Sequence, residues 1–157
     1  MVKMMEKLGF QVIIAGSDEE TSNIEKFSPV VNSCSVMVGV HGAGMTNEIY
    51  LPEGAVMILV RPLGFQDYLD VFSEAAPDMG LKYLEYKIKP EESSLVDEYG
   101  LDHPVLQNTS SVTSKGWAAG AAIYLEKQNV RLDMNRFRGT LVEALRFIGQ
   151  SKEVIKT

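Results

Sequence analysis

The sequence has 157 residues, of which 45% are hydrophobic and 23% charged, with a formal net charge of −6 at pH 7. This is the composition of one globular domain with a core of its own, and the acidic balance excludes a typical nucleic-acid binder. The single cysteine, Cys34, excludes an intrachain disulfide, and we expect it to be a buried, inert thiol. No apolar run approaches the roughly 20 residues of a membrane span, and no signal peptide is recognisable.

The chain opens on a predicted helix over residues 3–8 that ends at Gly9. A buried strand is expected over 10–15. Apolar positions at helical spacing then predict a helix over 22–32, bent or interrupted by Pro29. Because a helix leads directly into a strand at the start, we expect the chain to be the C-terminal part of a longer protein.

The rest of the chain alternates between strand and helix patterns. Phe65, Tyr68, Leu69 and Phe72 share one face of a predicted helix. Asp133 is the expected N-cap of the last helix. The expected elements are a strand over 35–40, a short helix ending at Tyr50, a turn over 52–54, a strand over 55–60, a helix over 65–76, a strand over 82–88, an irregular segment over 90–115, and helices over 114–128 and 134–148. This order predicts one α/β domain, 1–157, with an open and mostly parallel sheet of Rossmann-like type.

A glycine-rich loop between two predicted strands is the main candidate site. His41 and the Gly-Ala-Gly run 42–44 follow an apolar strand, and Thr46 and Asn47 begin a helix. Backbone amides converge at such a point and favour an anion, most often phosphate. Gly42 and Gly44 would let the backbone approach the ligand, and His41 would bond a phosphate or sugar hydroxyl or act in acid–base chemistry. The alternative is a plain tight turn beside a half-buried histidine.

Three ligand or enzyme classes fit this loop poorly. A dinucleotide fingerprint needs a third small residue, but Asn47 stands in that region and Arg61 replaces an acidic residue after the next strand. The Lys-Ser/Thr of a Walker A loop is absent. An esterase would need a G-x-S-x-G nucleophile, which the chain lacks. A diphosphate-bearing ligand such as a nucleotide sugar remains.

Other polar residues have two interpretations each. Glu91 and Glu92 would hold ribose hydroxyls, or they are first-turn helix charges. Arg61 would pair with a diphosphate, or it is a surface cation. The sequence Asp102-His103-Pro104 fits turn chemistry better than a metal or acid–base pair. With two histidines and no carboxylate cluster, we expect no dedicated metal site and no required cofactor.

Two further groups of residues carry expectations. Trp117 and Tyr124, at helical spacing, are expected in the core rather than in a sugar-binding platform. Asn108 begins an Asn-Thr-Ser triplet in a predicted loop and is a possible glycosylation site. Three arginines are expected on a solvated helix face: Arg131, Arg136 and Arg138.

Several segments in order resemble glycosyltransferase family 61, and the plant branch is the closer match. The central ones are residues 38–47 (VGVHGAGMTN) and 51–56 (LPEGAV). Downstream, the resemblance continues through 79–86 (MGLKYLEY), 91–95 (EESSL), 102–105 (DHPV) and 128–138 (QNVRLDMNRFR). It therefore covers most of the chain.

The resemblance implies a GT-B architecture, in which this chain is the C-terminal, donor-binding half. It also implies inverting transfer of a sugar, expected to be a pentose, from a UDP-sugar to xylan or an N-glycan. Family members are similar in being Golgi type II membrane proteins, so an anchor and an acceptor-binding half would lie outside this chain. The expected donor contacts are His41, Gly42, Ala43, Gly44, Thr46 and Asn47. The alternative is a non-catalytic nucleotide-sugar-binding module or an inactive truncated gene product.

Overall fold

The computed structural model describes residues 1–15, 21–65 and 71–149, and its centre is a parallel sheet. Three strands are hydrogen-bonded in the order β1-β2-β3. Their bounds are Val36–Val40 for β1, Val56–Arg61 for β2 and Lys82–Lys87 for β3. In the register, Val38 lies opposite Ile58, which lies opposite Leu84. All three strands predicted from apolar runs between 35 and 88 are confirmed, within one residue at each end.

The central strand β2 is buried along its whole length. Successive side chains of a strand point to opposite faces. Accordingly, Val56, Ile58 and Val60 belong to one hydrophobic cluster, and Met57 and Leu59 belong to the other. A strand covered on both faces needs a continuous apolar run rather than an alternating one, and the run predicted over 55–60 has that character.

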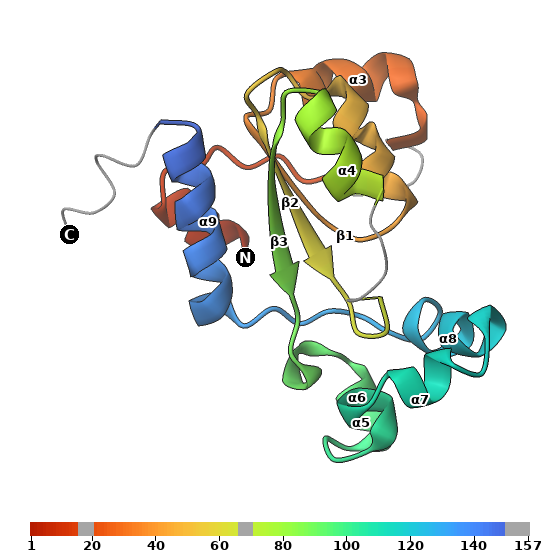
Figure 1. The fold of residues 1–157 in the computed structure, drawn as a ribbon. Coiled ribbons are helices and arrows are strands. Elements are labelled where there is room, and N and C mark those ends of the chain that lie inside the picture. Colours follow the sequence, from red (N-terminus) through yellow and green to blue (C-terminus); the bar gives the residue numbers. More distant parts are fainter. Residues whose placement is uncertain (16–20, 66–70, 150–157) are drawn as a thin grey trace.

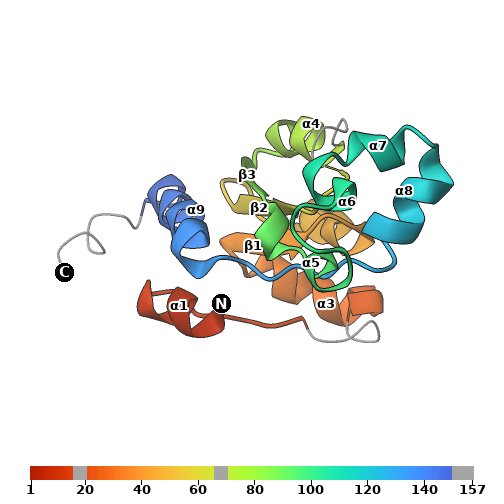
Figure 2. The same ribbon diagram turned by 90° about the horizontal axis from the view of Figure 1, so that it is seen from below.

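Helices cover both faces of the sheet, which makes a helix–sheet–helix sandwich (Figures 1 and 2). One face carries α1 (Val2–Lys7) and α9 (Met134–Phe147), and Phe137 and Leu141 of α9 enter its cluster. The other face carries α3 (Ile24–Asn32), α4 (Val71–Asp78) and the 3-10 helix η1 (Ala43–Tyr50). Parallel strands with helices on both sides confirm the α/β class and are compatible with the Rossmann-like type.

The segment after β3 is helical, so the expectation of an irregular stretch over 90–115 is wrong. It contains η2 (Pro90–Glu92), α5 (Leu95–Tyr99), α6 (Pro104–Gln107) and α7 (Ser110–Thr113), followed by α8 (Trp117–Tyr124). The prolines and polar residues that suggested a loop are helix-starting residues here. Pro90 and Pro104 each stand in the first turn, where proline needs no N–H partner. Figure 1 shows α5 to α8 beyond the ends to which the strand arrows point.

The expectation of a buried strand over 10–15 is also wrong. No strand is assigned there, and the Ile13 and Ile14 side chains are 61% and 69% exposed. A strand exists only where a neighbour completes its hydrogen bonds. Among the described strands, β1 pairs with β2 alone, so this apolar segment does not join the sheet.

The helix predictions hold with adjusted limits. Pro29 does not interrupt α3, which continues through it from an Asn23 cap. The helix expected over 65–76 is seen as α4, and Tyr68 and Leu69 lie outside the described residues. The last helix begins as predicted, because Asp133 accepts hydrogen bonds from the backbone N–H groups of two first-turn residues.

Cys34 is half-buried rather than buried, and its thiol donates to the Val30 carbonyl at 3.2 Å. Over residues 1–15, 21–65 and 71–149, no helix combines the length and the apolar character that a membrane crossing requires.

Candidate functional site

The loops that follow the three strands lie at one end of the sheet (Figure 1). β1 leads into residues 41–44, β2 into residues 62–65, and β3 into residues 88–92. In open parallel sheets this carboxyl edge is where ligands bind. The glycine-rich loop therefore occupies the position predicted for it.

His41 is held at this edge by its backbone and by two aromatic rings. Its N–H donates to the Val60 carbonyl at 2.9 Å, which extends the β1–β2 pairing by one residue. The imidazole lies nearly parallel to the Phe65 ring, with centroids 6.2 Å apart, and edge-on to Phe72 at 5.6 Å. Both phenylalanines are buried, whereas His41 is half-buried. The ring is thus positioned and still reachable from solvent.

The fold itself does not require glycine at positions 42 and 44. Neither has a φ in the left-handed region, since Gly42 is extended at φ 164°. A Cβ on Gly42 would meet nothing closer than the Val40 carbonyl at 3.9 Å, and one on Gly44 would meet nothing within 4 Å. Gly44 faces open space and Gly42 has room for a side chain, so a ligand could approach the backbone at both positions.

Other glycines around the sheet are required by packing. A Cβ on Gly39 would lie 2.3 Å from the Met45 sulfur. Gly64 has φ +83°, and its Cβ would lie 2.3 Å from the Tyr124 ring. Packing therefore accounts for glycine at positions 39 and 64, whereas it does not account for glycine at positions 42 and 44.

The helix after the loop is a 3-10 helix, not the α-helix of a typical phosphate site. Thr46 donates its hydroxyl to the Ala43 carbonyl at 2.6 Å, and the Asn47 amide donates to the Gly44 carbonyl at 3.0 Å. These side chains therefore brace the loop from within. The leading N–H groups of a first turn remain available to a ligand.

Arg61 is buried, so the interpretation as a surface cation is wrong. Its guanidinium pairs with Glu85 on the neighbouring strand β3, and Nη1 donates to the Phe65 carbonyl at 3.2 Å. The ion pair neutralises the arginine, and the hydrogen bond ties the β2 loop to the sheet. Arg61 thus positions Phe65, which in turn contacts His41.

Glu92 is part of the fold's interior, where only 3% of its surface is exposed. Its carboxylate pairs with Arg136 and accepts hydrogen bonds from the Tyr86 hydroxyl at 2.5 Å and the Asp133 N–H at 2.6 Å. It also accepts from the Lys89 N–H at 2.8 Å and so caps η2. Burial, together with the bond to Glu92, raises the pKa of the Tyr86 hydroxyl above its ordinary range.

The two adjacent glutamates thus differ. The contacts of Glu92 match the helix-start interpretation, and its carboxylate is occupied by partners within the protein. Glu91 is exposed. The three arginines do not share a solvated helix face either, because Arg136 lies over the Tyr86 ring at 5.0 Å. Arg131 precedes α9 and pairs with Asp97, whose pKa it lowers by hydrogen bonding.

Trp117 is the main residue that the sequence misplaced. It is 66% exposed instead of lying in the core, and its ring contacts Phe65 edge-on with centroids 5.9 Å apart. A weak signal was present: α8 is otherwise built mainly from small residues, so it lacks an apolar stripe wide enough to bury an indole at its first position. Tyr124, by contrast, is in the core as expected, and its hydroxyl donates to the Val105 carbonyl at 2.7 Å.

The remaining candidates lie apart from the glycine loop in the sequence. His103 caps α6, since its Nδ1 accepts the Val105 N–H at 3.2 Å, which confirms turn chemistry at this position. Asn108 is exposed at the end of α6, and its Oδ1 accepts the Ser110 hydroxyl at 2.5 Å. Its glycosylation stays a prediction. Within the described part of the chain, no group of three or more His, Cys, Asp or Glu side chains is placed to hold a metal ion.

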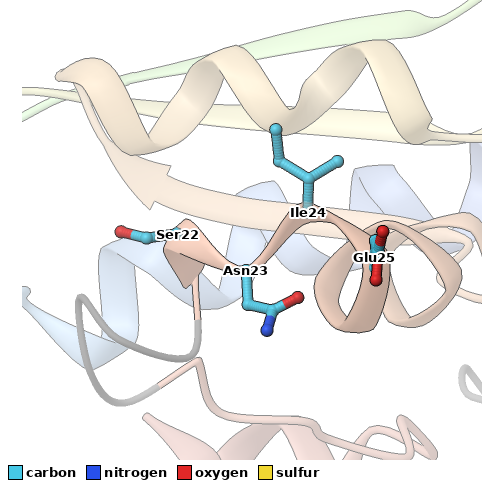
Figure 3. Close-up of a pocket in the computed structure, with 4 residues that line it drawn as sticks. All are labelled: Ser22, Asn23, Ile24 and Glu25. Atoms are coloured by element: carbon cyan, nitrogen blue, oxygen red, sulfur yellow. The ribbon is translucent and has the colours of Figure 1, made fainter.

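A depression at the start of α3 is a poorer candidate site. Its lining residues are consecutive, Ser22 to Glu25. Figure 3 shows their side chains pointing in different directions instead of converging on one point. We therefore place the candidate site at the His41 loop.

Comparisons with known proteins point to plant glycosyltransferases. The chain is 42% identical, over 92% of its length, to a xylan glycosyltransferase of Arabidopsis thaliana, of which it covers 29%. It is also 42% identical over 92% of its length to an α-1,3-arabinosyltransferase of Oryza sativa subsp. japonica, covering 25% of that protein. A β-1,2-xylosyltransferase of the same rice is 39% identical over 94% of the chain, which covers 32% of it.

The chain thus spans about a quarter to a third of the length of these curated relatives. No family model matches the chain, and no solved structure matches it either.

Proposed function

This chain belongs to glycosyltransferase family 61, and from that premise we propose that it forms the donor-binding half of an enzyme that transfers a pentose from a UDP-sugar to xylan or an N-glycan. The names of the relatives support the reaction class, since they are arabinosyl- and xylosyltransferases. A UDP donor is consistent with a loop whose exposed backbone would suit a diphosphate.

One observation carries the assignment of the site. Gly42 and Gly44 need neither a left-handed backbone nor space for a packed neighbour, yet both lie in the loop directly after β1. Beside them, His41 is held between two buried rings at the carboxyl edge of the sheet. A diphosphate lying against this loop would account for both features.

In this proposal the loop stabilises the leaving group. Inverting transfer forms a bond from an acceptor hydroxyl oxygen to the anomeric carbon while the bond from that carbon to the diphosphate breaks. The electron pair passes to the phosphate oxygen, where the backbone N–H groups of Ala43 and Gly44 and the His41 imidazole would meet the growing charge. The Met45 N–H is already bonded to the Gly42 carbonyl. The acceptor proton goes to a base, which we do not assign to this loop.

The larger organisation is part of the same proposal. The sandwich would be one of the two Rossmann-like halves of a GT-B enzyme, which as a whole would be a Golgi type II membrane protein. The exposed Asn108 triplet is consistent with a secretory-pathway setting. We expect the transfer to require no metal ion, and this stays a prediction.

Calorimetric titration of the purified chain with UDP tests the site directly. We expect binding that weakens at least tenfold in His41→Ala. The matched control is His103→Ala, because His103 is the other histidine of the chain and caps α6 instead of facing the loop. If a folded chain does not bind UDP, or if both variants bind it as tightly as the parent, the site assignment is wrong.

A further inference from the structure

Trp117 is an exposed indole next to the candidate donor loop. It is the first residue of α8 and follows Gly116, whose φ of +106° lets the chain turn sharply into the helix. Two-thirds of its surface is open to solvent. An indole offers a large flat apolar surface, and the fold leaves most of it uncovered.

The Trp117 indole is linked to His41 by ring contacts through Phe65. The centroids of the Trp117 and Phe65 rings are 5.9 Å apart. The centroids of the Phe65 and His41 rings are 6.2 Å apart. The Phe65 carbonyl is held in turn by Arg61. Two aromatic contacts therefore separate Trp117 from the histidine of the donor loop.

The segment that carries Trp117 is anchored to the β2 loop at further points. The Tyr124 ring lies so close to Gly64 that a methyl group on this glycine would overlap the ring. The Gln128 side-chain amide donates to the Leu63 carbonyl and accepts from the Leu63 N–H, both at 3.1 Å. Because α8 is anchored at its C-terminal end and Trp117 itself contacts Phe65 at its N-terminal end, the exposed indole is presented in a set position, as a preorganised binding group requires.

We propose that Trp117 is a stacking platform for a sugar ring of the acceptor glycan, beside the donor loop. The proposal rests on the function proposed above and assigns an acceptor contact to the same domain. A xylopyranose ring has no exocyclic CH₂OH group, so both of its faces are flat and rich in C–H groups. Such a face matches an uncharged aromatic surface.

The exposure of the indole favours a glycan over the donor's base. Small-ligand sites enclose most of the ligand's surface, on the order of 70–90%. A ring that is 66% exposed on the outside of a helix covers one face of its ligand only. That suits a polysaccharide lying across the surface better than an enclosed uracil.

Trp117 is the only tryptophan in the sequence, so its fluorescence reports on this position alone. Xylohexaose and UDP are titrated separately into the folded 157-residue chain, with acrylamide as quencher. We expect a solvent-exposed spectrum without ligand. Xylohexaose should shift the emission to shorter wavelength and lower the quenching constant about twofold, while UDP leaves both nearly unchanged.

Variants separate this proposal from the proposed donor site. On native electrophoresis through a xylan gel, Trp117→Ala should lose the retardation of the parent chain, and Trp117→Phe should keep part of it. Phe147→Ala is the matched control, because Phe147 is an exposed aromatic residue at the end of α9. Trp117→Ala should still bind UDP, and His41→Ala should still respond to xylohexaose.

Three results would overturn the proposal. Protection of the indole by UDP instead of xylohexaose would assign the platform to the nucleobase. A blue-shifted, quencher-resistant spectrum without ligand would mean that another part of the protein or a second copy covers it. No response to xylohexaose from a chain that binds UDP would remove the acceptor role and leave the donor site standing.

Discussion

The carboxylate of Glu92, which follows the last strand of the sheet, pairs with the guanidinium of Arg136 at the start of the last helix. The two residues are 44 positions apart in the sequence, so this pair joins the end of the sheet to that helix. The same carboxylate accepts from Tyr86 on β3, whose ring also lies beneath the Arg136 guanidinium. Removing one partner of a buried pair leaves the other charge without compensation.

The first prediction concerns this pair. Arg136→Leu should lower the free energy of unfolding by about 3 kcal/mol, because it leaves the Glu92 carboxylate buried without its cation. Arg138→Leu, an exposed arginine on the same helix, should change it by no more than about 0.5 kcal/mol. Urea unfolding followed by circular dichroism measures both. Equal losses in the two variants would contradict the role given to Glu92.

A second prediction contrasts two glycines. Gly44→Ala should leave the free energy of unfolding unchanged or raise it by up to about 1 kcal/mol, since the position is open and right-handed. UDP affinity should nevertheless fall about tenfold, because the added methyl would stand where the proposed diphosphate site meets the backbone. Calorimetry and urea unfolding on the same sample separate the two effects.

Gly64→Ala is the structural counterpart. Its φ of +83° and the 2.3 Å approach of a Cβ to the Tyr124 ring should cost at least about 2 kcal/mol of stability. If Gly44→Ala destabilises the chain as much as Gly64→Ala, packing rather than ligand binding explains the glycine at position 44.

The third prediction is a loss of stability at alkaline pH. Burial raises the pKa of Tyr124 to about 12, whereas tyrosine in an unfolded chain titrates near pH 10. Between about pH 10 and 12 the unfolded chain has lost a proton that the folded chain keeps, so the free energy of unfolding falls as pH rises. Below pH 10 the contribution is fully present. The raised pKa of Tyr86 acts in the same direction.

Urea unfolding at several pH values between 8 and 11 measures this slope. Tyr124→Phe should be less stable than the parent at pH 8, by about 1 kcal/mol, because its hydroxyl no longer reaches the Val105 carbonyl. Its stability should then fall less steeply above pH 10. An unchanged slope in this variant would show that other groups cause the alkaline loss.

The fourth prediction concerns Asn108. Expression through the secretory pathway of a plant cell should add a glycan at this exposed position, visible as a mass increase that glycosidase treatment removes. Asn108→Gln should abolish the increase. Thr109→Ala should leave it in place, since the Ser110 hydroxyl of the triplet is retained. A protein secreted without any glycan would contradict the expectation.

Much of the fold near the site was predictable because its signals are local. An apolar run ending in glycines, followed by a helix start, predicts a strand–loop–helix unit wherever it occurs. β1, the loop after His41 and β2 lie where these patterns indicated. The Asp133 cap was found in the same way, since a capping residue acts on its own next turn.

The failures arose where a residue's state depends on distant neighbours. Residues 10–15 are apolar, but a strand also needs a hydrogen-bonding partner, which sequence patterns do not supply. Arg61 and Glu92 have the charge of surface residues, yet their partners Glu85 and Arg136 lie 24 and 44 residues away and make burial tolerable. Trp117 has a large apolar side chain of the kind found in cores, but among the described residues no helix or strand packs over most of its surface.

The sequence by itself therefore determined the family, the parallel sheet and the glycine loop with His41 at its edge, because strand, turn and helix-start patterns are set by neighbouring residues. Only the tertiary structure decided which side chains accompany that loop. Arg61 and Glu92 are buried in it, Phe65 and Phe72 contact the His41 ring, and Trp117 contacts Phe65. The reason is physical: burial and ring contact depend on residues that are remote in the chain and meet only when the layers pack.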